Sequence, residues 1–146
     1  MLRLHDTATG VVTELNPARP GHLSMYVCGP TVSGDPHLGH GRFHLIWDVL
    51  RSYATWCGLS VKYVSNVTDI NDKIITSASQ EGRSEDDVAA HYEGVWWSTM
   101  EALGVQRPDA DPHATRYVEQ MVELVGELVA AGKAYVGGDG VYFSTS

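Results

Sequence analysis

The chain has 146 residues, of which 43% are hydrophobic and 19% are charged. This is enough apolar material for one globular domain with a single core, and it excludes an intrinsically disordered chain. Ten Lys and Arg residues against 18 Asp and Glu residues give a net charge of −8, which disfavours a surface built mainly to bind nucleic-acid phosphates. The sequence has no apolar run of transmembrane length and no secretory signal, so we expect a cytoplasmic protein that spans no membrane.

The first part of the chain predicts a β-ribbon followed by a strand–helix–strand unit. Asp35 before Pro36 is typical of an N-cap followed by the first residue of a helix. Strand, helix and strand of these lengths form a βαβ unit, so we expect a parallel sheet. We place the ribbon, first strand, helix and second strand at residues 1–15, 23–28, 37–57 and 59–67.

The second part predicts three helices and a hairpin. Ser84 is the expected N-cap of the second of these helices, and Trp96 lies on its apolar face, where we expect it to pack in the core. Gly137 to Gly140 form the expected hairpin turn. The helices are placed at 69–80, 85–103 and 114–131, and the hairpin strands at 134–136 and 141–143.

Two histidines stand at the start of the first predicted helix. Ligands bind at the carboxyl ends of parallel strands, which is where this helix begins. His37 and His40 are three residues apart, so they lie on one face of the first turn, and Gly39 between them leaves the backbone open. Imidazoles at a helix N-terminus suit the phosphates of a nucleoside triphosphate. The alternative is that both histidines merely cap the helix.

Three segments resemble a known family. PHLGH at 36–40 resembles the HIGH signature of class I aminoacyl-tRNA synthetases. YVCGPTV at 26–32 and NVTDINDKI at 66–74 are similar to the corresponding segments of cysteinyl-tRNA synthetases. The resemblance implies an α/β fold of the Rossmann-like (HUP-type) class, with a parallel sheet and flanking helices. It further implies that residues 1–146 are the N-terminal half of the nucleotide-binding catalytic domain, without the rest of that domain or the anticodon-binding region.

The resemblance also implies the roles of individual residues. ATP, with Mg²⁺, would be bound by the HIGH segment and the loop before it, and the histidines would be catalytic. The substrate cysteine would be bound at the ends of the two strands, where a hydroxyl and a carboxylate could hold its ammonium group. The implied ATP-binding residues are His37, Gly39, His40, Thr31 and Pro30, and the implied substrate residues are Cys28, Gly29, Thr68 and Asp69.

Cys28 would in addition be a zinc ligand, and zinc would bind the substrate thiolate. The other zinc ligands and the KMSKS loop are expected further along a longer chain, so we expect this chain alone to be inactive. Taken by themselves, the residues leave open that Cys28 is a buried structural thiol and that Thr68 or Asp69 caps the following helix. Cys57 is expected only to pack.

The function implied is ATP-dependent activation of cysteine to cysteinyl-adenylate and its transfer to tRNA(Cys), by a monomer. The partners are then L-cysteine, ATP and tRNA(Cys). One alternative is the cysteine ligase of mycothiol biosynthesis, which transfers cysteine to an amino sugar, although Lys73 favours the tRNA enzyme. The other alternative is a free-standing, non-enzymatic binding module.

Overall fold

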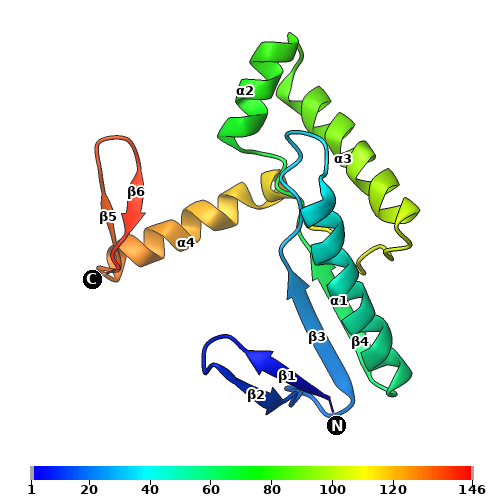
Figure 1. The fold of residues 1–146 in the computed structure, drawn as a ribbon. Helices are drawn as coiled ribbons and strands as arrows, with labels where there is room; N and C mark the ends of the chain where they lie inside the picture. The colour runs from blue at the N-terminus through cyan, green and yellow to red at the C-terminus, as the bar shows by residue number, and fades with distance from the viewer. Residues whose placement is uncertain (1, 146) are drawn as a thin grey trace.

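The computed structural model describes residues 2–145 and shows a mixed α/β fold (Figure 1). A central strand–helix–strand unit carries two helices at one end, while a hairpin at each end of the chain lies away from it. The elements are β1 (Arg3–Asp6), β2 (Val11–Glu14), β3 (His22–Val27), α1 (Leu38–Trp56), β4 (Ser60–Ser65), α2 (Asp72–Glu81), α3 (Glu85–Ala102), a 3₁₀ turn (Ala114–Tyr117), α4 (Val118–Ala130), β5 (Ala134–Val136) and β6 (Val141–Phe143).

The predicted parallel βαβ unit is confirmed. β3 and β4 pair in parallel from His22 opposite Ser60 to Val27 opposite Ser65. A further segment, which the sequence predicts to be only a loop, runs parallel to β4: Ser65 N donates to Ala110 O and Val67 N to Pro112 O. The carboxyl end of β4 therefore lies between the end of β3 and residues 110–113, and this edge is where the predicted site residues gather.

Alternation along β3 places its apolar residues against α1. Leu23, Met25 and Val27 are buried, together with Tyr63 of β4 and Ala54 of α1. The intervening β3 residues are exposed, so among the described residues a helix covers only one face of this sheet. A second core forms where α2 and α3 pack at the carboxyl end of the strands; it comprises Val32, Val67, Ile74, Ala78, Val88 and Ala89.

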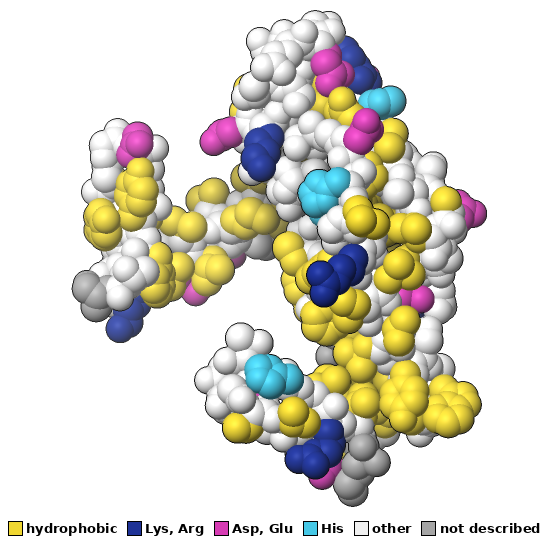
Figure 2. Space-filling view, viewed as in Figure 1, with side chains coloured by type: hydrophobic (Ala, Val, Ile, Leu, Met, Phe, Trp, Pro, Cys, Tyr) yellow, Lys and Arg dark blue, Asp and Glu magenta, His cyan; other side chains and the backbone are white. Residues whose placement is uncertain are grey.

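The apolar periodicity of α1 predicts a helix correctly, but most of its apolar residues are exposed. Trp47, Leu50 and Ala54 pack against β3 and β4. The other apolar residues of α1 stay exposed because this sheet, within the described part of the chain, has only two strands and is too narrow to cover them. α4 is likewise amphipathic, and none of its residues is buried. Figure 2 shows these apolar side chains at the surface of α1, α4 and the β5–β6 hairpin. The exposed residues of α1 include Phe43, Leu45, Ile46, Val49, Tyr53 and Trp56.

Three helix starts differ from the prediction. α1 is capped by His37 and not by Asp35, because the imidazole itself accepts a backbone hydrogen bond. α2 begins at Asp72, three residues later than predicted, because the side chain of Asn71 accepts from Lys73 N. The last predicted helix starts with a 3₁₀ turn before α4. The N-terminal ribbon, the Ser84 cap and the C-terminal hairpin are confirmed. No helix within residues 2–145 is long and apolar enough to cross a bilayer.

Candidate functional site

His37 and His40 form a reciprocal cap at the start of α1. The Nδ1 atom of His37 accepts from Gly39 N at 3.1 Å, and the Nδ1 atom of His40 accepts from His37 N at 3.1 Å. The two rings stack, with centroids 3.8 Å apart and planes 19° from parallel. Two of the orphan amide donors of the helix are therefore satisfied by imidazole nitrogens. The capping role that the sequence left open is thus present in the structure.

Capping also determines which nitrogen carries the proton. A neutral imidazole has one donor and one acceptor nitrogen, so acceptance at Nδ1 places the hydrogen on Nε2 in both rings. Burial lowers the pKa of His40, and the charge of the neighbouring His37 lowers it further, which favours the neutral form. Both rings present an Nε2–H donor beside the positive end of the α1 dipole. Two such donors can bind the oxygens of a phosphate group, so capping and ligand binding are compatible here.

Gly39 also has a role within the cap itself. A Cβ at this position would lie 3.0 Å from the Cε1 and Nδ1 atoms of His37. The missing side chain therefore gives room first to the His37 ring, which folds back over the helix start. The next glycine, Gly41, meets Leu103, since a Cβ there would lie 2.8 Å from the Leu103 Cδ1 atom. The absence of a side chain at Gly39 therefore leaves room for the His37 ring in the cap, and its absence at Gly41 allows α1 to lie close to the end of α3.

The loop after β3 is held by the residues after β4. Gly29 N donates to the Asn66 side-chain oxygen at 3.0 Å, and Thr68 N donates to Pro30 O at 2.8 Å. Val32 N in turn donates to Thr68 O, and Thr31 and Thr68 form a parallel bridge. The expected site residues Gly29, Pro30, Thr31 and Thr68 are therefore brought together. Asn66 was not among them. Its side chain contacts both Gly29 and Thr68, and so both sides of the junction between the loop after β3 and the residues after β4.

At Gly29 the loop after β3 lies very close to the backbone after β4. A Cβ built on it would lie 1.6 Å from the Asn66 backbone oxygen, so no side chain fits there. The Asn66 Nδ2 atom also donates to the Thr68 hydroxyl, which fixes that hydroxyl at the end of β4. Cys28, directly before Gly29, is exposed and is not part of a disulfide. The structure thus places Cys28 at the surface of the strand end and not in the core.

Asp69 contacts a segment that is distant in sequence. One carboxylate oxygen accepts from Thr115 N at 2.9 Å and the other from the Thr115 hydroxyl at 2.5 Å. Burial raises the pKa of Asp69, but the hydrogen bonds from Thr115 and the nearby His113 outweigh burial, so the pKa is lowered overall. Neither Thr68 nor Asp69 caps α2, because Asn71 does so. Asp69 holds the segment before α4 at the strand ends.

His113 belongs to the same segment. Its Nε2 atom lies 3.0 Å from a carboxylate oxygen of Glu93 on α3, and its Nδ1 atom lies 2.9 Å from Asp111 O. The other Glu93 oxygen accepts from the Trp97 indole at 3.0 Å. These contacts fasten residues 111–113 to α3. The sequence carries no local signal for the contact between His113 and Glu93, because the two residues lie 20 positions apart and do not belong to one helix.

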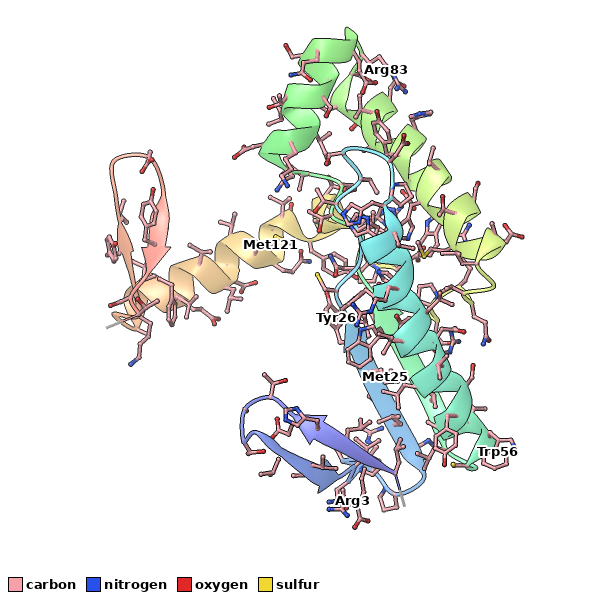
Figure 3. The ribbon with its side chains drawn as sticks, viewed as in Figure 1. Arg3, Met25, Tyr26, Trp56, Arg83 and Met121 are labelled. Atoms are coloured by element: carbon pink, nitrogen blue, oxygen red, sulfur yellow. The ribbon has the colours of Figure 1, made fainter. Side chains whose placement is uncertain are left out.

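A cavity of about 330 Å³ opens beside this segment. Figure 3 labels two of its walls, Tyr26 on β3 and Met121 on α4. Its walls are mostly apolar, and Asn66 and His113 supply polar atoms. A mostly apolar pocket with a few polar groups, at the carboxyl ends of parallel strands, is typical of a ligand site. Its remaining walls are Pro112, Ala114 and Tyr117.

The expected zinc ion needs several donor side chains in one place. Zinc sites in proteins use three or four Cys, His, Asp or Glu ligands in close contact. Within residues 2–145 no group of three such side chains is close enough to hold a metal ion. Cys28 supplies one exposed thiol, and Cys57 lies separately at the end of α1. The described residues therefore do not form a zinc site, and no chemical step is assigned to zinc.

Residues 14–146 match the family described as the tRNA synthetases class I (C) catalytic domain. A Mycobacterium tuberculosis methionyl-tRNA synthetase in complex with methionyl-adenylate is similar in structure, with a TM-score of 0.68, 21% identity and coverage of 77% of this chain and 23% of that chain. A LeuRS from Agrobacterium radiobacter, in a ternary complex with tRNA and LeuAMS, gives a TM-score of 0.68, 22% identity and coverage of 82% and 16%. The chain thus spans about a fifth of the length of these structures, and the likeness to them is one of fold.

Proposed function

The chain belongs to the tRNA synthetases class I (C) catalytic domain family, and we propose that it carries the ATP-binding part of a site that forms cysteinyl-adenylate. The observation that carries this proposal is the pair of Nε2–H donors that His37 and His40 present at the start of α1. The proposed activity belongs to the native protein, which would then transfer cysteine to the 3′-terminal adenosine of tRNA(Cys). We also propose that residues 1–146 form the N-terminal half of its nucleotide-binding domain.

The proposed chemistry uses the histidines as donors to phosphate. An oxygen of the cysteine carboxylate attacks the α-phosphorus of ATP, which is bound with Mg²⁺. The bond from that phosphorus to the bridging oxygen breaks, and pyrophosphate leaves with the electron pair. Negative charge on the phosphate oxygens grows in the transition state, where preorganised N–H donors stabilise it most. His37 and His40 need no proton transfer for this role, which agrees with the lowered pKa of His40.

The residues that follow β3 and β4 support the substrate half of the proposal. We propose that Pro30 and Thr31 border the adenosine, and that Gly29, Thr68 and Asp69 border the amino acid. The Asp69 carboxylate already accepts two hydrogen bonds from Thr115. Its proposed contribution is therefore a negative charge near the ammonium group together with the placement of this segment. An oxygen with two lone pairs can accept a further bond from the substrate.

The choice of cysteine rests on Cys28 and the segments around it. We propose Cys28 as one ligand of a zinc ion whose other ligands lie outside the described residues. The test is the zinc content of the native protein after Cys28→Ala, with Cys57→Ala as the matched control, because both thiols are exposed. Loss of zinc in the first variant alone supports the assignment. Equal zinc content in both variants would remove Cys28 from the metal site.

The activity is tested by amino-acid-dependent exchange of pyrophosphate into ATP, with cysteine, methionine and leucine offered separately to the native protein. We expect exchange with cysteine only. His40→Asn should lower kcat by about 10²-fold, since a donor to developing charge is lost. His5→Asn, at an exposed position in β1, is the control. Exchange that depends on another amino acid, or that survives His40→Asn unchanged, would contradict the proposal.

A further inference from the structure

A third histidine follows the pair at the start of α1. His44 lies one turn after His40, is only 6% exposed, and has no part in the cap. Trp96 of α3, 3% exposed, meets both of these histidines. The indole ring is edge-on to His40, with centroids 5.5 Å apart at 71°, and edge-on to His44, with centroids 4.9 Å apart at 82°. One buried indole therefore joins the two imidazoles.

These contacts restrict the ring of His40 from several directions. His37 stacks on it at 3.8 Å, the His37 amide donates to its Nδ1 atom, and Trp96 touches it edge-on. Only Nε2 is left for a ligand. The orientation of this Nε2–H depends on Trp96 keeping its position, and His44 is the polar side chain packed against Trp96.

We propose that His44 and Trp96 are positioning residues, in which His44 fixes the Trp96 indole and the indole fixes the ring of His40 with its Nε2–H directed at the phosphates of the nucleotide. This inference rests on the proposed adenylate-forming function, because it assigns the geometry of one of the proposed catalytic donors. Neither residue touches the substrate; both act through His40.

The surroundings of His44 favour a neutral ring, as this role requires. The small cavity beside it is lined by uncharged side chains, among them Tyr63, Ser65 and Gln106. A protonated His44 would have no counter-charge among the side chains that line this cavity. Burial lowers the pKa of His44, and the charge of His40 lowers it further. Edge-to-face aromatic contacts are directional, so a neutral His44 holds the indole in one orientation, which a non-aromatic side chain of similar volume does not do.

The first test reads the geometry directly. Long-range ¹H–¹⁵N NMR of the chain reports which His40 nitrogen carries the proton. We expect a single Nε2–H form in the wild type, and a mixture with Nδ1–H after His44→Leu. His44→Phe, which retains the aromatic edge, should restore the single form. Met100→Leu is the matched control, since Met100 is a similarly buried α3 residue one turn after Trp96. Both leucine substitutions roughly conserve volume, so the fold should tolerate them.

The second test separates positioning from binding in the native protein. His44→Leu should lower kcat of pyrophosphate exchange by about two- to tenfold, the equivalent of one aromatic contact, with the KM for cysteine unchanged. His44→Phe should recover most of this loss. If His44→Leu leaves the His40 tautomer as in the wild type, or if Met100→Leu disturbs it equally, the positioning role is wrong. If the wild type shows no exchange while the tautomer responds as described, the proposed function fails and the structural coupling stands.

Discussion

The junction between Gly29 and Asn66 makes the sharpest prediction about stability. In Gly29→Ala the new Cβ would lie 1.6 Å from the Asn66 backbone oxygen and 2.8 Å from its carbonyl carbon. Because Cβ contacts under 3.0 Å essentially never occur, the two backbone segments must separate by the difference of 1.4 Å. The contact is with backbone and not with the end of a flexible side chain, so no rotamer change relieves it.

Separation of the two segments breaks specific hydrogen bonds. The bond from Gly29 N to the Asn66 side chain and the bond from Thr68 N to Pro30 O both span the junction. Each contributes about 0.5–1.5 kcal/mol, and forced overpacking adds about 1–3 kcal/mol. We therefore expect Gly29→Ala to lower the free energy of unfolding by about 3 kcal/mol. Urea unfolding followed by tryptophan fluorescence should show a midpoint lower by roughly 1–3 M.

The matched control lies five residues further along. Gly34 has no atom within 4 Å of a built Cβ, and its φ is not in the left-handed region. Gly34→Ala should therefore leave stability unchanged or raise it by about 0.4–1 kcal/mol, because alanine reduces the freedom of the unfolded chain. If Gly29→Ala is no more destabilising than Gly34→Ala, the close approach of the two strand ends is wrong, and so is the joined geometry of the candidate site.

Two further predictions concern ionisable groups. The pKa values of His40 and His44 in the folded chain are lowered below the ordinary histidine value of 6.5, so the unfolded chain binds more protons as the pH falls below 6.5. The two neutral histidines therefore contribute to stability above pH 6.5, and this contribution is lost below it. Urea unfolding should give a lower free energy of unfolding at pH 5.5 than at pH 7.5, and His44→Leu should reduce this difference. A difference that His44→Leu leaves unchanged would contradict the assignment. Asp69→Asn replaces one acceptor oxygen by an amide nitrogen and should lower stability at pH 7 by about 1–2 kcal/mol in the same assay. The pKa of Asp69 is also lowered, so its contribution is lost only in acid, below the unfolded value near 3.8; a loss equal to that of wild type on acidification in the Asn variant would contradict the prediction.

The sequence determined the local features because their signals are local. Hydrophobic spacing predicted β3, α1 and β4, and their lengths implied a parallel pair. The motif residues were placed correctly at the carboxyl ends of the strands, since chain order alone puts them there. Burial of Trp96 followed from its helical face, and the structure confirms it.

The tertiary structure decided the contacts between distant segments. Gly29 meets Asn66 across 37 residues, and Asp69 meets Thr115 across 46. Such pairs depend on strand register and on the docking of residues 109–114 against β4, which no local period encodes. Even the α1 cap changed from Asp35 to His37, because the stacked imidazole rings satisfy the amides of the first turn and the expected aspartate is not needed. Local propensity therefore positions the site along the chain, while long-range hydrogen bonding and packing decide which atoms of its residues remain free for a ligand.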